Sequence, residues 1–184
     1  EWGKILGFFV GSRRVIQDAN ASICLNKEEY SQLKEKGNNQ NIFLLENSVD
    51  IELFAQSKNS LIRKKYNIKD DTFVCLVSGR IDPQKNQLLL LQVIKQMKNV
   101  HVLLVGNITD EKYQHTIQHY IHEHNLEKHV TIISNLKPQS QELINMYLIS
   151  DVLILPSKHD PFGIVALEAW ASSLPVIISD IAGV

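Results

Sequence analysis

Five short apolar runs occupy the second part of the chain and limit the folds that it can adopt. The runs are FVCLVSG (73–79), VHVLLVG (100–106), VTIIS (130–134), DVLILPS (151–157) and PVIISD (175–180). They are rich in valine, isoleucine and leucine without polar alternation, which is typical of parallel strands covered on both faces. Segments with helical periodicity lie between them, at 84–98, 139–150 and 162–173. This alternation predicts an α/β fold with a doubly wound parallel sheet and right-handed crossovers.

Residues 1–50 have a different organisation. They contain a predicted helix around residues 4–19, a strand at SICLN, a polar helix at EEYSQLKEKG and a second strand at NIFLLEN. This order predicts the tail of a separate α/β unit, and the polar, basic stretch 57–71 is a predicted interdomain connection. We therefore expect three parts, 1–56, 57–71 and 72–184. The chain begins without methionine and stops soon after a predicted strand, so we expect a fragment.

Composition excludes several classes of partner and site. The formal net charge is −1, so no basic excess indicates nucleic acid or an anionic membrane as a partner. Any anion-binding site must therefore be built locally. Cys24 and Cys75 each lie in a short apolar run, and we interpret them as small buried side chains in a reducing compartment.

The histidines raise the question of a metal site. His115, His119 and His122 are spaced i, i+4 and i+7, which could bind a metal. The apolar face of the same predicted helix lies opposite them, so we expect the three side chains to face solvent. Asp110 and Asp151 are isolated in the sequence, and no carboxylate cluster indicates a magnesium site. We expect no metal.

The loop SGRIDPQKN (78–86) is the first candidate for binding an anion. In doubly wound sheets the ligand lies at the carboxyl ends of the strands, near helix N-termini. Asp82-Pro83 suits a turn that opens a helix at Gln84, and Arg80 and Lys85 could converge on one anion across that turn. The loop has neither GxGxxG nor GxxxxGK[ST]. The alternative, that two basic residues merely decorate a loop, stays open.

The stretch HDPFGIVALEAW (159–170) is the second candidate, because it holds a carboxylate among apolar side chains. Gly163 allows a close backbone approach near the predicted start of a helix, whose dipole favours a phosphate. Glu168 lies further along that helix and should have a partner, since a buried unpaired carboxylate costs several kcal/mol. Two partners are open: the hydroxyls of a sugar diol, or a cation such as Arg80.

Taken together, these motifs resemble a known family. GRIDPQKN, VLLVG, DVLILPS, DPFGIVALEA and LPVIISD are similar, in this order, to motifs of the retaining nucleotide-sugar glycosyltransferases of family four (group 1), which have the GT-B fold. ANASICLNKEEYSQL and NSVDIELF resemble the end of its N-terminal domain. The resemblance implies that 1–56 ends the acceptor-side domain and that 72–184 is a Rossmann-like donor-binding domain, truncated at its C-terminus.

The resemblance also implies roles for particular residues. Arg80 and Lys85 match the basic pair that neutralises the donor diphosphate, and Asp160 matches the acid that contacts the transferred sugar; we expect these three to be catalytic. Glu168 matches the second acid of the family's E-x7-E motif, which holds the ribose hydroxyls of the donor. The residues expected to bind the donor are Phe162, Gly163, Ile164 and Glu168, with Asn135 and Leu136 lining the base pocket.

The expected reaction moves a sugar from a nucleoside diphosphate to an acceptor hydroxyl with retained anomeric configuration. It needs no cofactor besides the nucleotide-sugar donor, and the acceptor could be a glycan, a lipid or a small molecule. We expect a cytoplasmic protein without nucleic-acid partners, and a membrane-surface association through the missing N-terminal domain stays open. Asp160 stands where the family usually has glutamate, which puts its reach to the sugar in question. The rivals are a non-catalytic nucleotide-binding module, a nucleotide-sugar epimerase or a sugar phosphorylase.

Overall fold

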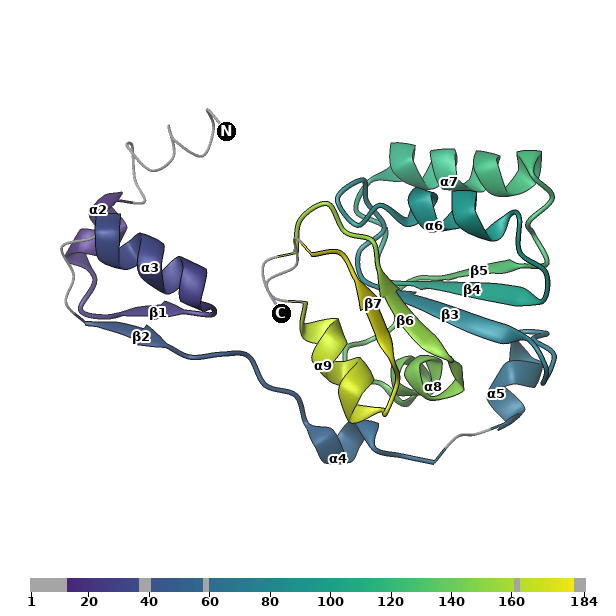
Figure 1. Ribbon diagram of the computed structural model, residues 1–184, viewed down its shortest axis with the longest axis horizontal. Helices are drawn as coiled ribbons and strands as arrows, with labels where there is room; N and C mark the ends of the chain where they lie inside the picture. The colour runs from purple at the N-terminus through teal and green to yellow at the C-terminus, as the bar shows by residue number, and fades with distance from the viewer. Residues whose placement is uncertain (1–12, 37–40, 58–59, 161–162, 181–184) are drawn as a thin grey trace. The chain divides into compact units, whose positions relative to one another are not determined.

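The computed structural model describes residues 13–36, 41–57, 60–160 and 163–180 (Figure 1). The chain forms two compact units, Glu1–Ser48 and Val49–Val184. The predicted helix around residues 4–19 falls partly outside the described residues. Within the described part, no helix is long and apolar enough to cross a membrane.

The first unit contains a small parallel sheet. Its elements are α2 (Arg13–Asp18), β1 (Ser22–Cys24), α3 (Lys27–Lys36) and β2 (Ile42–Leu44). β1 pairs with β2 in parallel, with Ile23 opposite Phe43. The predicted order of strand, polar helix and strand is therefore present.

The second unit includes a short helix before the predicted interdomain connection. Helix α4 (Ile51–Phe54) is capped by Asp50, whose side chain accepts a hydrogen bond from the Leu53 N–H group. Phe54 is fully buried in the core of the second unit. Residues 49–56 thus belong to the second compact unit, where Phe54 makes its apolar contacts. How the units correspond to functional domains of a whole protein stays a prediction.

A five-stranded parallel sheet forms the centre of the second unit. Its strands are β3 (Phe73–Ser78), β4 (Val100–Val105), β5 (Val130–Ile133), β6 (Val152–Leu155) and β7 (Val176–Ile178). They lie in the order β5-β4-β3-β6-β7, so the chain starts at the middle strand, moves to one edge and then returns to build the other. This arrangement confirms the predicted doubly wound α/β fold.

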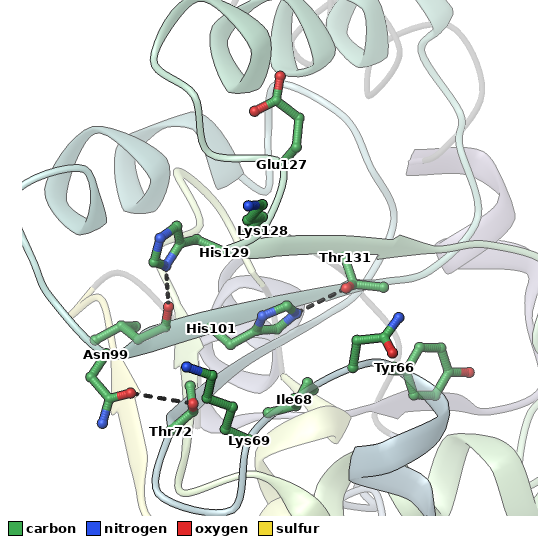
Figure 2. A pocket seen from close by; sticks show the side chains of 12 residues that line it. Tyr66, Ile68, Lys69, Thr72, Asn99, His101, Glu127, Lys128, His129 and Thr131 are labelled. Carbon is green, nitrogen blue, oxygen red and sulfur yellow. Dashed lines mark hydrogen bonds between the residues drawn. The ribbon is translucent and has the colours of Figure 1, made fainter.

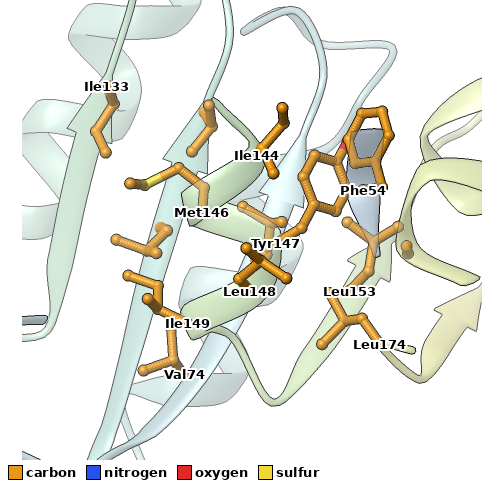
Figure 3. Close-up of a cluster of buried hydrophobic side chains, with 14 of the residues drawn as sticks. Phe54, Val74, Ile133, Ile144, Met146, Tyr147, Leu148, Ile149, Leu153 and Leu174 are labelled. Carbon is orange, nitrogen blue, oxygen red and sulfur yellow. The ribbon is translucent and has the colours of Figure 1, made fainter. Parts of the chain in front are cut away.

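Helices cover both faces of this sheet (Figure 1). They are α5 (Ser60–Lys65), α6 (Gln87–Ile94), α7 (Glu111–Glu123), α8 (Gln141–Ile149) and α9 (Ile164–Ala171). Val74 and Leu76 of β3 point into the core shared with α8 and α9, and Cys75 and Val77 point into the core shared with α6 and α7. Figure 3 shows the first core around Tyr147. A strand buried on both sides has no polar alternation, which explains the apolar runs in the sequence.

The two cysteines are free and buried, as the sequence predicted. Burial raises the pKa of the Cys75 thiol to about 11. A thiol with so high a pKa is a poor nucleophile at neutral pH, so Cys75 acts as a small apolar core residue.

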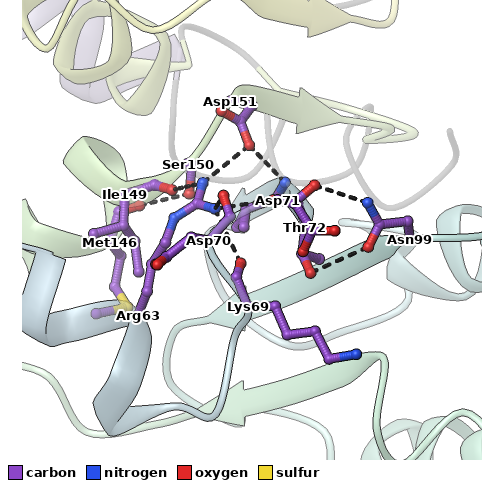
Figure 4. Close-up of polar contacts among 11 residues, drawn as sticks. Arg63, Lys69, Asp70, Asp71, Thr72, Asn99, Met146, Ile149, Ser150 and Asp151 are labelled. Atoms are coloured by element: carbon purple, nitrogen blue, oxygen red, sulfur yellow. Dashed lines mark hydrogen bonds and ion pairs between the residues drawn. The ribbon is translucent and has the colours of Figure 1, made fainter.

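At the amino edge of the sheet, where its strands begin, Arg63 joins helix α5 to the stretches 70–72 and 149–151 (Figure 4). Its Nη1 donates to the carbonyl oxygens of Asp70 and Thr72, at 3.1 and 2.9 Å. Its Nη2 donates to the Ile149 carbonyl oxygen at 2.8 Å and to Asp151 Oδ2 at 3.1 Å. The same Asp151 oxygen accepts a hydrogen bond from the N–H group of Val74. Asp151, isolated in sequence, therefore has a structural partner.

We expect Arg63→Ala to lower the free energy of unfolding by about 3 kcal/mol, because it leaves a partly buried carboxylate and several carbonyl groups without their donor. Lys65→Ala is the matched control on the same helix, since the ion pair of Lys65 with Glu142 is exposed. This control should lower the stability much less than Arg63→Ala does, because exposed ion pairs contribute little. Urea denaturation measures both, and equal losses in the two variants would contradict the role of Arg63.

Candidate functional site

The loops that follow β3 and β6 lie against each other at the carboxyl edge of the sheet. Gln84 connects them twice: its side-chain Nε2 donates to the His159 carbonyl oxygen at 2.9 Å, and its own carbonyl accepts from the Lys158 N–H group at 2.8 Å. The Asn86 side chain adds a bond to the Pro156 carbonyl oxygen. β3 and β6 are neighbours in the sheet, so the two loops chosen from the sequence form one surface.

Asp82 shapes the first of these loops. Its side chain is buried, and Oδ1 accepts hydrogen bonds from the N–H groups of Gln84 and Lys85. Oδ2 lies 3.4 Å from the guanidinium of Arg80. The turn that results occupies the positions where we predicted the start of a helix, so α6 begins at Gln87 rather than at Gln84. Arg80 remains about half exposed, which leaves its guanidinium open to a ligand.

Lys85 forms an ion pair with Asp160 across the two loops. The Lys85 Nζ lies 2.7 Å from Asp160 Oδ2, and both side chains are largely buried. Asp160 Oδ1 accepts a hydrogen bond from the N–H group of Gly163 at 2.9 Å. Both oxygens of Asp160 thus have protein partners, while the ammonium group, with three protons, can still donate to an anion. The expected contact of Asp160 with a transferred sugar stays a prediction.

Gly163 marks the start of α9. It has φ of 62° and ψ of 49°, the left-handed region that glycine adopts without steric cost, and α9 then begins at Ile164. This agrees with the helix start expected from the sequence at residue 162 or 163. Phe162, one of the predicted donor-binding residues, lies outside the described residues.

Glu168 has a protein partner that the sequence did not indicate. The hydroxyl of Tyr147, on α8, donates a hydrogen bond to Glu168 Oε2 and lies 2.9 Å from Ser78 Oγ. A phenol has one proton, so the hydroxyl that donates to Glu168 accepts from Ser78. Burial raises the pKa of the Glu168 carboxyl, and the bond from Tyr147 counteracts part of that rise.

The alternative of an ion pair between Glu168 and Arg80 is not what the structure shows. Arg80 instead contacts Asp82 and the Gln84 side chain, at 3.4 and 3.5 Å. Glu168 nevertheless lies at the same edge as Arg80, because Tyr147 ties it to Ser78, the last residue of β3. The acid and the basic loop therefore belong to one surface.

Asn135 and Leu136 follow β5 and also lie at this edge. The Asn135 N–H group donates to the Asn107 side chain, in the loop after β4, at 3.1 Å. Leu136 is half-buried and packs against the core on the α8 face. Their place beside the loops of β4 and β5 is compatible with lining a ligand pocket, and that role stays a prediction.

Sequence reasoning missed Tyr147, Gln84 and Asn107. Tyr147 lies in the apolar stretch INMYLIS, where an aromatic residue is expected to be plain core. A buried tyrosine that needs a hydrogen-bond partner, together with a glutamate that needs one, was the available signal. Nothing in the spacing of 21 residues between them indicated contact.

A hollow of about 700 Å³ lies at the opposite, amino edge of the sheet (Figure 2). Its two histidines have hydrogen-bond partners within it: His101 Nε2 bonds to Thr131 Oγ1 at 2.8 Å, and His129 Nδ1 to the Val100 carbonyl oxygen at 3.0 Å. Burial lowers the pKa of His101, which favours a neutral ring. These groups are satisfied without a ligand, so the hollow is not our candidate site.

The three histidines of α7 are exposed, as predicted. His119 and His122 pair with Glu123 and Glu127 on the solvent side. Among the residues that the structure describes, no group of three or more histidine, cysteine or acidic side chains is placed to hold a metal ion.

Comparison with known proteins gives a family match. A family model described as "Glycosyl transferases group 1" matches residues 58–184. The D-inositol 3-phosphate glycosyltransferase of Mycobacteroides abscessus is 28% identical over 179 residues, covering 95% of this chain and 40% of that protein. The UDP-Gal:alpha-D-GlcNAc-diphosphoundecaprenol alpha-1,3-galactosyltransferase of Escherichia coli is 30% identical over 195 residues, covering 100% of this chain and 46% of its own length. The chain thus spans less than half of these relatives.

A solved structure shares the fold. The crystal structure of HepE from Anabaena in complex with UDP-glucose superposes with a TM-score of 0.85 at 21% identity. The match covers 97% of this chain and 50% of that protein. This likeness supports the GT-B architecture expected from the sequence motifs.

A further prediction concerns Gly106, which lies beside the site. A Cβ atom at Gly106 would stand 2.0 Å from the carbonyl oxygen of Gly79, just before Arg80. We expect Gly106→Ala to lower the free energy of unfolding by about 2–3 kcal/mol more than Gly79→Ala. Both glycines have φ near 150°, but a Cβ at Gly79 meets only the Lys85 side chain at an ordinary 3.5 Å. Thermal denaturation of both variants tests this, and equal losses would contradict it.

Proposed function

Because this chain belongs to the glycosyl transferases of group 1, we propose that the full-length protein transfers a sugar from a nucleoside diphosphate to an acceptor hydroxyl with retention of anomeric configuration. The observation that supports this most is that Arg80 and Lys85 follow β3 directly, while Tyr147 joins Glu168 to Ser78, the last residue of the same strand. The two cations can bind the negatively charged diphosphate, and the carboxylate can accept hydrogen bonds from the hydroxyls of the ribose.

Leaving-group stabilisation would drive this reaction. Arg80 and Lys85 lie on the loop after β3, where their charges can face a diphosphate as negative charge develops on the departing oxygen. The N-terminus of α9 adds the positive end of its helix dipole on the neighbouring loop. A front-face departure through an oxocarbenium-like state needs no protein nucleophile, and this is the basis for proposing retention.

Lys85 already has an ion-pair partner without the donor. Its Nζ lies 2.7 Å from Asp160 Oδ2. We propose that this pair fixes the ammonium group in place and that Asp160 faces the transferred sugar once the diphosphate shares the lysine. Pre-oriented charge acts on the transition state without further reorganisation.

The names of the relatives indicate the chemical class of the substrates. One relative's name specifies UDP-galactose and a lipid-linked acceptor, and one structural neighbour holds UDP-glucose. We therefore propose a uridine diphosphate hexose as donor, so that the enzyme would be a hexosyltransferase. The proposed acceptor carries its hydroxyl on a glycan, a lipid-linked glycan or a polyol.

The experiment that tests the proposal incubates the full-length protein with UDP-hexoses and a panel of hydroxyl acceptors. Formation of a glycosylated product whose anomeric signal in nuclear magnetic resonance matches that of the donor is the expected result. An inverted product would overturn retention. Nucleotide binding without any transfer or donor hydrolysis would favour a non-catalytic module, and conversion of the donor without an acceptor would favour an epimerase.

We expect Arg80→Ala and Lys85→Ala each to reduce turnover at least tenfold, about 1.4 kcal/mol of barrier, because each removes a charge that stabilises the leaving diphosphate. Lys128→Ala is the control, since Lys128 is exposed at the amino edge of the sheet. Steady-state kinetics at saturating donor measures the effect. Near-normal turnover in both site variants would count against the assigned roles.

A further inference from the structure

The contact between Tyr147 and Glu168 adds a residue to the site. We propose that Tyr147 is a positioning residue: its hydroxyl holds the Glu168 carboxylate in the orientation and charge state that bind the donor ribose. This inference rests on the proposed function, because it assumes that Glu168 receives the ribose hydroxyls. It assigns to Tyr147 a task that plain core packing does not require.

The Tyr147 ring is held rigidly. It is among the largest fully buried side chains of the second unit, and Phe54 packs its ring edge-on against it, with centroids 5.5 Å apart at an angle of 89°. Phe54 itself is completely buried on α4. A ring fixed on its faces and edges can place its hydroxyl at one point, so the oxygen can act as a fixed anchor.

Two hydrogen bonds then orient that hydroxyl. Burial, and next the charge of Glu168, raise the pKa of the Tyr147 phenol well above its ordinary value, so it keeps its proton. The proton goes to Glu168 Oε2, and the hydroxyl oxygen accepts from Ser78 on β3. The direction of these two hydrogen bonds, from serine to tyrosine and from tyrosine to glutamate, follows from the single phenol proton.

The bond leaves part of Glu168 for a ligand. Within the part of the chain that the structure describes, no hydrogen bond reaches Glu168 Oε1, since the Tyr147 hydroxyl bonds to Oε2. An ionised carboxylate offers about four lone-pair sites, of which Tyr147 takes one. A vicinal diol can therefore donate both of its hydroxyl protons to the group that Tyr147 orients.

The same bond favours the ionised form of Glu168. Burial raises the pKa of Glu168 and the Tyr147 bond lowers it, so removing the hydroxyl raises the pKa further. A protonated carboxyl accepts hydrogen bonds more weakly, so ribose binding is lost as pH falls through the pKa of Glu168. Without the Tyr147 hydroxyl, that loss occurs at a higher pH.

The test compares two nucleotides on three forms of the full-length protein. Calorimetry measures the Kd of UDP and of 2′,3′-dideoxy-UDP for the wild type, Tyr147→Phe and Tyr66→Phe. Tyr66 is the matched control: its hydroxyl also donates to a glutamate, Glu142, at 2.6 Å, but between α5 and α8. We expect the wild type and Tyr66→Phe to bind UDP more tightly than the dideoxy analogue. In Tyr147→Phe the ratio of the two Kd values should be about tenfold smaller.

The outcomes separate the two proposals. A wild type that binds both nucleotides equally, or neither, overturns the ribose clamp in the proposed function. A wild type that prefers UDP while Tyr147→Phe keeps the full preference overturns the inference and leaves the function standing. As the pH is lowered, UDP binding should be lost at a higher pH in Tyr147→Phe than in the wild type. Loss at the same pH in both proteins would contradict the proposed effect of Tyr147 on the charge of Glu168.

A second variant keeps the test decisive if Tyr147→Phe does not fold. Ser78→Ala retains the phenol but removes its second partner. We expect a smaller loss of the preference for UDP, in the same direction. An unchanged preference in Ser78→Ala would then overturn the hydrogen-bonded chain as the means of positioning.

Discussion

The burial of β3 on both faces is the constraint on which the second unit depends. Its side chains alternate between two apolar cores, so polar chemistry has no place along the strand itself. All five strands are parallel, so all of them begin at the amino edge of the sheet and end at the carboxyl edge, and these two edges differ. The hydrogen bonds of Arg63 hold the amino edge together, and the carboxyl edge carries the loops with the paired charges of Lys85 and Asp160. Structure and proposed chemistry are thus separated along the strand direction.

The carboxyl edge is built mainly from contacts between loops. Asp82 fixes the loop after β3, Gln84 attaches it to the loop after β6, and the pair of Lys85 with Asp160 brings a cation into a largely buried place. On the other side of β3, Tyr147 brings Glu168 to the same edge. Each charged group therefore has a protein partner before a ligand arrives, which keeps the site ordered and leaves remaining donors and acceptors for a substrate.

Several residues of the candidate site can be picked out in the sequence because they break a local pattern. Glu168 lies among apolar neighbours and Gly163 precedes a helix, and both are anomalies that a reader of the sequence can find. The exact start of α6 could not be predicted, since a side-chain cap by Asp82 competes with helix formation over the next residues. The burial of Phe54 could not be predicted either, because it depends on contact with Tyr147 on a distant helix.

The sequence by itself determined the strands, their parallel arrangement and the edge that carries the candidate loops, because these follow from local periodicity and from the chirality of crossover connections. Only the tertiary structure decided which groups pair. Lys85 meets Asp160 across 75 residues and Tyr147 meets Glu168 across 21, and such pairs depend on how loops and helices pack on the finished sheet. Partner choice is a property of three-dimensional packing, which no pattern of neighbours along the chain encodes.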